Sequence, residues 1–112
     1  GPTGATGTMS ETETAVPGTT YDFVLTDADK IVSSNNGSAT TFTIPTNASV
    51  AFPIGTRIDM IQLGTGKLTI AAAGGVTLNS QGGNKSAAAQ YVALSLWKQG
   101  TNTWYLMGNL IA

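Results

Sequence analysis

Short runs of β-branched and aromatic residues make up most of the chain, and Gly, Asn, Ser or Pro closes each run within a few positions. β-Branched and aromatic residues favour extended backbone, whereas Gly, Asn, Ser and Pro favour turns. No segment keeps a helical period, and we expect a helical turn at 27–30 alone. Turn signals recur roughly every 8–12 residues, which predicts an all-β fold of about eight strands, an antiparallel β-sandwich of jelly-roll type.

The runs also indicate how some of the strands pair. We expect strands at residues 20–25, 30–34, 40–44, 56–63, 66–72, 76–79, 89–99 and 103–112. The turn Gly64-Thr65-Gly66 predicts a hairpin between the fourth and fifth strands, and residues 100–102 predict a hairpin between the last two. Within 56–63 the apolar alternation changes phase between Met60 and Ile61, which predicts a β-bulge or burial on both faces.

The final hairpin is apolar on both of its faces. One face of its first strand carries Val92, Leu94 and Leu96, and the other carries Tyr91 and Trp97. In the second strand Trp104 and Leu106 alternate with Tyr105 and Met107. A small sandwich has one interior, so the second apolar face predicts a partner, most economically further copies of the chain.

We therefore assign the large side chains of this hairpin to the core or to a subunit interface. The assigned residues are Tyr91, Trp97, Trp104, Tyr105 and Met107. The alternative is that some of these aromatic rings are exposed and stack on sugar rings. Because Trp97 and Trp104 lie on either side of the hairpin turn, we expect them to face each other.

Glycine recurs at every third position at the start of the chain, at Gly1, Gly4 and Gly7. This period is typical of collagen, in which three chains wind around one axis that only glycine can approach. The period breaks at Ser10. Residues 1–18 are therefore interpreted as the end of a collagen-like stalk with a linker, and residues 19–112 as a head domain that forms a homotrimer. Gly1-Pro2 is also the remnant that some proteases leave on an expressed chain, which would weaken this interpretation.

Composition restricts the chemistry that the chain can perform. The 112 residues include no Cys and no His, which excludes disulfides, thiol nucleophiles, His-based triads and nearly all zinc sites. A charged fraction of 10% and a net charge of −1 argue against nucleic acid as a partner, and no apolar run is long enough to insert into a membrane. We expect no catalytic residues, no cofactor and no metal.

Two short motifs resemble functional sites without completing them. Asp22, Asp27 and Asp29 are close in sequence but lack the spacing of a calcium loop, so we expect them to bind backbone N–H groups in a turn. Asp59 is beside Arg57 on a strand and has no second acid nearby, so we expect no acid–base pair for glycan hydrolysis.

Several segments in order resemble a module of tailed-bacteriophage structural proteins. They are "TIP" (43–45), "SVAFPIGT" (49–56), Gln-x-Gly-x-Gly (62–66), "GVTLNS" (75–80) and "TWYLMGNL" (103–110). The resemblance covers about residues 20–110 and consists of strands and turns, with no catalytic signature. In such proteins the module often ends a tail fibre, a minor tail protein or a head fibre, sometimes behind collagen-like repeats.

The resemblance implies a non-enzymatic virion appendage, on the tail or the capsid surface, that contacts other virion proteins and a host-surface glycan or protein. The alternative function is purely structural, as a trimerisation cap or a capsid-decorating head fibre without receptor binding. Two Asn- and Gly-rich loops are the candidate receptor contacts, with Asn35 and Asn36 in the first and Gln81 and Asn84 in the second.

Overall fold

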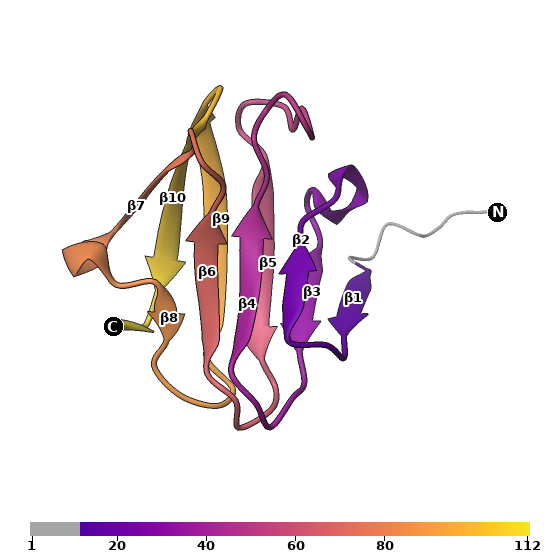
Figure 1. Cartoon of the computed structure of the whole chain (residues 1–112), viewed down its shortest axis with the longest axis vertical. Coiled ribbons are helices and arrows are strands. Elements are labelled where there is room, and N and C mark those ends of the chain that lie inside the picture. Colours follow the sequence, from indigo (N-terminus) through magenta and orange to yellow (C-terminus); the bar gives the residue numbers. More distant parts are fainter. Residues whose placement is uncertain (1–11) are drawn as a thin grey trace, which may run out of the picture.

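The computed structural model describes residues 12–112, and these residues form two β-sheets (Figure 1). The strand order is β1-β3-β5-β9-β10-β7 in the six-stranded sheet and β11-β8-β6-β4-β2 in the five-stranded sheet. The strands are β1 (Glu13–Val16), β2 (Thr20–Asp22), β3 (Ile31–Ser34), β4 (Thr40–Ile44), β5 (Arg57–Gln62), β6 (Leu68–Ala72), β7 (Thr77–Ser80), β8 (Ser86–Ala87), β9 (Ala93–Gly100), β10 (Thr103–Gly108) and β11 (Leu110–Ile111). The predicted all-β class is confirmed, with eleven strands in this part of the chain.

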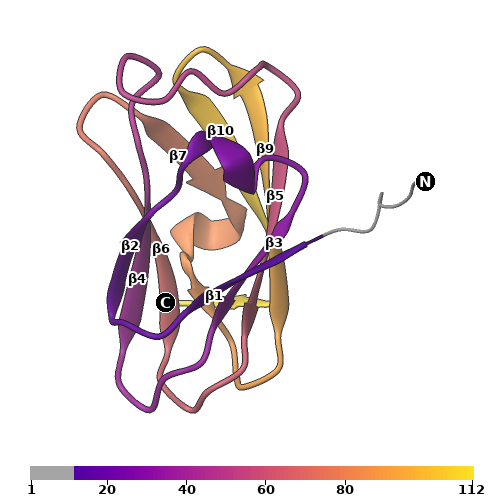
Figure 2. The ribbon, with the colours of Figure 1, turned by 90° about the vertical axis from the view of Figure 1, so that its right-hand side faces the viewer.

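From β1 to β6 the chain passes to the opposite sheet at every connection. As a result β1, β3 and β5 are parallel neighbours in one sheet, and β2, β4 and β6 are parallel neighbours in the other. Parallel neighbours need a crossover, and here the crossover is a strand of the facing sheet. Figure 2 shows the two layers and these connections edge-on.

The two sheets are compatible with the predicted β-sandwich, but the predicted antiparallel pairing is wrong for β1 to β6. Here the chain forms successive coils, each with one strand in either sheet, and the coils stack with their strands parallel. Antiparallel pairing joins β5 to β9, β9 to β10, β6 to β8 and β8 to β11, so both sheets are mixed. A strand with one face on the core alternates in the same way whether its neighbour is parallel or antiparallel, so the pattern of the runs did not distinguish them.

The expected hairpin across Gly64-Thr65-Gly66 is also wrong. β6 pairs with β4 and β8, whereas β5 pairs with β3 and β9, so this turn carries the chain from one sheet to the other. The turn stacks on the β3–β4 connection, and the Gly66 N–H donates to the Asn36 carbonyl at 2.8 Å. A Cβ atom on Gly66 would lie 1.9 Å from the carbonyl oxygen of Ser38. Glycine is required here by the close approach of two backbones.

β5 keeps a constant register with β3 and β9, so the expected bulge at Met60 and Ile61 is absent from this strand. Ile58, Met60 and Gln62 all point into the core. The apparent phase change arises because a glutamine takes an inward position. Its side-chain oxygen accepts from the Leu68 N–H at 3.0 Å and its amide donates to the Gly64 carbonyl at 3.1 Å. Both polar groups are thus satisfied inside the domain.

The expected strand 20–25 ends early and the helical turn begins early. β2 stops at Asp22, and the 3-10 turn η1 (Leu25–Asp27) takes the place of the turn expected at 27–30. Asp27 is buried and accepts hydrogen bonds from the Val24 N–H at 2.9 Å and the Tyr21 hydroxyl at 2.6 Å. The prediction that an aspartate of this cluster binds a backbone N–H is confirmed for Asp27.

The N-terminal segment differs from the expected linker. Residues 13–16 form β1, which pairs with β3 at the edge of the six-stranded sheet, so the β-domain begins before residue 19. The run Glu13–Val16 has few apolar residues, so it forms a strand because it pairs with β3, and its composition alone does not predict a strand. Gly1, Gly4 and Gly7, on which the stalk prediction depends, lie outside the described residues.

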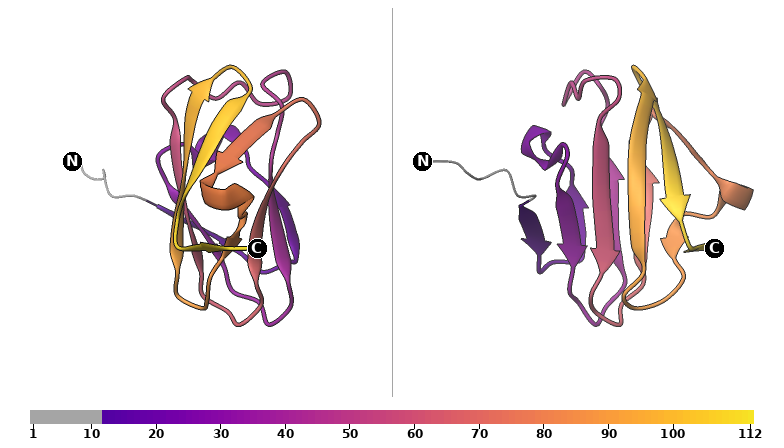
Figure 3. Two further views of the ribbon diagram at one scale, coloured as in Figure 1. Left: turned by 90° about the vertical axis from the view of Figure 1, so that its left-hand side faces the viewer. Right: turned by 180° about the vertical axis from the view of Figure 1, so that it is seen from behind.

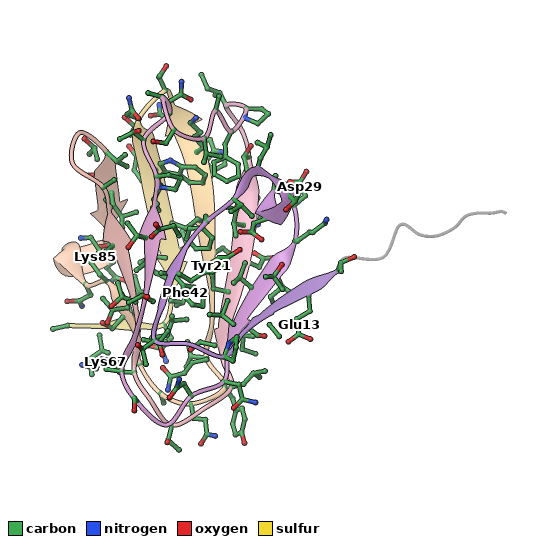
Figure 4. All side chains as sticks on the ribbon, turned by 45° about the vertical axis from the view of Figure 1, so that its right-hand side comes forward. Glu13, Tyr21, Asp29, Phe42, Lys67 and Lys85 are labelled. Atoms are coloured by element: carbon green, nitrogen blue, oxygen red, sulfur yellow. The ribbon has the colours of Figure 1, made fainter. Side chains whose placement is uncertain are left out.

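The core lies between the two sheets and is lined by the inward residues of both. Tyr21 and Phe42, on the neighbouring strands β2 and β4, pack edge to face with ring centroids 5.6 Å apart (Figure 4). Trp104 is 1% exposed and packs edge to face on Phe52, again at 5.6 Å. These contacts lie on the inner faces of the two sheets, so the side chains on the outer faces take no part in them.

Candidate functional site

Large apolar side chains remain on the outer face of the six-stranded sheet, on β9 and β10. Trp97 is 40% exposed, Tyr105 36% and Met107 40%. They line a groove of about 500 Å³ together with residues of β7 and of the 3-10 turn η2 (Gln81–Gly83). Figure 3 (right) shows this face, and its left panel shows the edge at which η2 lies. We call this site the outer-face groove.

The strand register explains why these side chains meet. Trp97 lies opposite Tyr105 across β9 and β10, and Tyr105 lies opposite Asn79 across β10 and β7. Opposite residues of neighbouring strands project to the same face, so the three form a row. The rings of Trp97 and Tyr105 have centroids 5.8 Å apart and an angle of 35° between their planes. They therefore form one shallow, continuous aromatic surface.

A polar cluster borders this surface on the β5 side. Arg57 lies opposite Trp97 in the register, and Asp59 lies opposite Ser95. The Ser95 hydroxyl donates to Asp59 Oδ1 at 2.7 Å, and Arg57 Nε lies 3.6 Å from the same oxygen. All three polar residues line a second hollow of about 400 Å³. Met107 lines both this hollow and the outer-face groove. The Arg57 and Asp59 side chains are 59% and 34% exposed, so the cluster is accessible to a ligand. An exposed ion pair of this kind contributes little to stability.

Only some of the residues assigned to the core or to a subunit interface lie in the groove. Trp97, Tyr105 and Met107 line it, whereas Trp104 is in the core and Tyr91 is 70% exposed in the connection before β9. The expectation that Trp97 and Trp104 face each other is wrong. Trp104 pairs with Lys98 in the register, so the two indoles are on opposite faces of the sheet.

The predicted receptor loops separate into two regions. Gln81 lines the outer-face groove, and Asn84 follows it with its N–H donating to the Gln81 carbonyl at 3.1 Å. Asn35 and Asn36 lie in the β3–β4 connection and do not line the groove. The Asn36 amide donates to the Pro17 carbonyl at 2.9 Å and its oxygen accepts from the Ser38 N–H at 2.9 Å. Asn36 therefore ties successive coils together.

A buried lysine lies on the inner face, directly after Trp97. Lys98 is 1% exposed, and its ammonium donates to Asn47 Oδ1 at 2.7 Å and to the Phe52 carbonyl at 2.6 Å. Burial lowers the pKa of Lys98 from its usual value, because desolvation penalises the charged form. Lys98 anchors the long β4–β5 connection to the core, a structural function that sequence reasoning missed.

The sequence reasoning also missed the contribution of neighbouring strands to the groove. Arg57, Asp59, Ser95 and Asn79 carried no signal as binding residues. Within a strand, the spacing of two residues does place Arg57 with Asp59 and Ser95 with Trp97 on common faces. The register between strands, which brings these pairs together, has no such local signal.

Within residues 12–112, no group of three or more Asp or Glu side chains lies close enough together to hold a metal ion. Over the same residues, none of the helices is long and apolar enough to cross a membrane. Comparison of the chain with models of known protein families, with curated proteins and with solved structures finds no match. The resemblance to bacteriophage modules therefore remains a prediction.

Proposed function

We propose that this domain is a non-enzymatic attachment module, the head of a bacteriophage appendage on the tail or capsid surface, and that it binds a host-surface ligand through the outer-face groove. The observation that carries the proposal is the exposed pair of Trp97 and Tyr105. Large apolar rings held open to solvent by a rigid sheet are typical of binding surfaces. The resemblance to phage modules supplies the biological setting.

The groove favours binding over catalysis. Asp59 is the one acidic residue that lines either hollow among residues 12–112, and Ser95 and Arg57 already engage its carboxylate. Glycoside hydrolysis normally uses two carboxylates on either side of the bond that breaks. The site thus offers surface for recognition and lacks the partner that an acid–base mechanism requires.

The alternative is a structural cap in which the same face joins three copies of the chain. The exposure of Trp97, Tyr105 and Met107 in a single chain also favours this function, since subunit interfaces are enriched in aromatic residues and Met. In a trimer that leaves the groove open, three weak sites on one stalk would act together through avidity.

One variant separates the two functions. The double substitution Trp97→Ala with Tyr105→Ala removes both rings, and Ile54→Ala, at a position 65% exposed outside the groove, is the matched control. The readouts are the mass in solution by light scattering and co-sedimentation with a panel of bacterial cells and isolated envelopes.

For the attachment function, the double variant keeps its mass and loses sedimentation with cells, while the Ile54 variant behaves as the parent chain. A fall of the mass from three chains to one would instead assign the face to the subunit interface. Retention of both mass and cell binding would overturn the proposal for this groove.

A further inference from the structure

The outer-face groove combines a flat apolar surface with neutral polar edges. Trp97 and Tyr105 supply the surface, and Asn79 and Gln81 stand exposed beside it. Each amide side chain offers both a donor and an acceptor. A ligand held here therefore needs flat apolar faces in contact with the rings and hydroxyl or amide groups around its edge.

The charges around the groove select against ionic ligands. The outer-face groove is lined by residues without charge. The second hollow has one cation and one anion, Arg57 and Asp59, which form an ion pair. The residues that line the two hollows therefore carry no net charge, and they provide no electrostatic attraction for an anionic polymer such as a nucleic acid or a polyuronate. The lining suits an uncharged ligand.

From these observations we propose that the outer-face groove binds an uncharged saccharide. The apolar faces of its pyranose rings stack on Trp97 and Tyr105, and Asn79, Gln81 and the Arg57–Asp59–Ser95 cluster hydrogen-bond its hydroxyls. This inference rests on the proposed function, because it names the chemical class of the ligand for the same site. The rings are pre-positioned by the β9–β10 register, so binding orders few side chains.

The two tryptophans of the chain provide a specific assay. Trp97 is 40% exposed and Trp104 is 1% exposed, so acrylamide quenches chiefly Trp97 in the parent chain. The probes are soluble cello-, malto- and N-acetylglucosamine oligosaccharides, a printed array of neutral glycans, and polygalacturonate as the anionic comparison. We expect at least one neutral glycan to protect Trp97 from acrylamide, with its quenching constant reduced about twofold or more.

Variants localise the effect. In Trp97→Phe only the buried Trp104 reports, so the saccharide should leave the fluorescence unchanged. Tyr105→Ala and Asn79→Ala should each weaken binding about tenfold or more, within the range for central interface residues. The control Ile54→Ala should bind as the parent chain does.

The outcomes distinguish the ligand class from the function. Cell binding that depends on Trp97 without protection by any neutral glycan would overturn the saccharide and leave the attachment function standing. Stronger, salt-sensitive binding of polygalacturonate would overturn the uncharged class. Protection of Trp97 without cell binding would support the saccharide and contradict attachment to those cells. A trimer that dissociates in Trp97→Ala and binds no glycan would assign the groove to a second copy of the chain.

Discussion

The substitution Gly66→Ala tests the stacking of the coils, which is the least expected feature of the fold. The new Cβ would lie 1.9 Å from the Ser38 carbonyl oxygen and 2.8 Å from that of Asn36. Both contacts are with backbone, which cannot rotate away as a flexible side chain can. The two connections must therefore separate by roughly 1 Å or more to reach an ordinary contact distance.

The expected loss of stability follows from that separation. The displaced connections lose the 2.8 Å hydrogen bond from the Gly66 N–H to the Asn36 carbonyl, and a buried unsatisfied group costs about 1–3 kcal/mol. Strain from overpacking adds about 1–3 kcal/mol. We expect Gly66→Ala to lower the free energy of unfolding by about 2–6 kcal/mol, a large part of the typical total of about 5–15 kcal/mol.

Gly74→Ala is the matched control. No atom lies within 4 Å of a Cβ at Gly74, and its φ is outside the left-handed region, so alanine should be neutral or stabilise by up to about 1 kcal/mol. Urea unfolding of both variants, followed by tryptophan fluorescence, gives the two values. A loss below about 0.5 kcal/mol for Gly66→Ala, or equal losses at both positions, would refute the stacked arrangement.

Two further predictions concern the buried ionisable residues. Because folding lowers the pKa of Lys98, the unfolded chain binds more protons than the folded chain at pH values between this lowered pKa and the unfolded value of 10.5. The contribution of Lys98 to stability should therefore increase with pH over this window in urea titrations. In Lys98→Met this increase should vanish, and parallel curves for the two proteins would contradict the assignment. Burial, the hydrogen bond to Asp27 and the Asp27 charge raise the pKa of Tyr21, so Asp27→Asn should lower it toward 10.0, the usual value for a tyrosine. Ultraviolet titration of the phenol measures the pKa of Tyr21, and an unchanged pKa in the variant would contradict the contribution of Asp27. The same variant should lose about 1–3 kcal/mol, because one amide oxygen replaces two carboxylate oxygens as acceptors.

Alternation within single strands was sufficient to predict several elements correctly. The strand expected at residues 40–44 forms as β4, and the alternate residues Phe42 and Ile44 are buried on its inner face. The final hairpin forms as β9 and β10, antiparallel and joined by a short turn. In each case the signal lies within one run of residues or one turn, where the two-residue period and turn chemistry operate.

Pairing between distant strands had no comparable signal. β4 and β6 are parallel partners although 28 positions separate Thr40 from Leu68 in their register, and nothing in either run specifies the other. The groove depends on the same information. Tyr105 and Met107 were recognisable as neighbours on one face, but Asn79 and Arg57 reach them only through the register of β7 and β5.

The sequence alone determined the all-β class of the described residues, the positions of several turns and the residues that share a strand face, because these properties depend on local backbone preference and on a period of two. Only the tertiary structure decided which face is inside. On β9, Leu94 and Leu96 point inward, so the same period turns Lys98 inward and Trp97 outward. Hydrophobicity alone predicts the reverse. The arrangement holds because the Asn47 side chain and the Phe52 carbonyl receive the buried ammonium, and those oxygens come from a connection more than forty residues away in the chain.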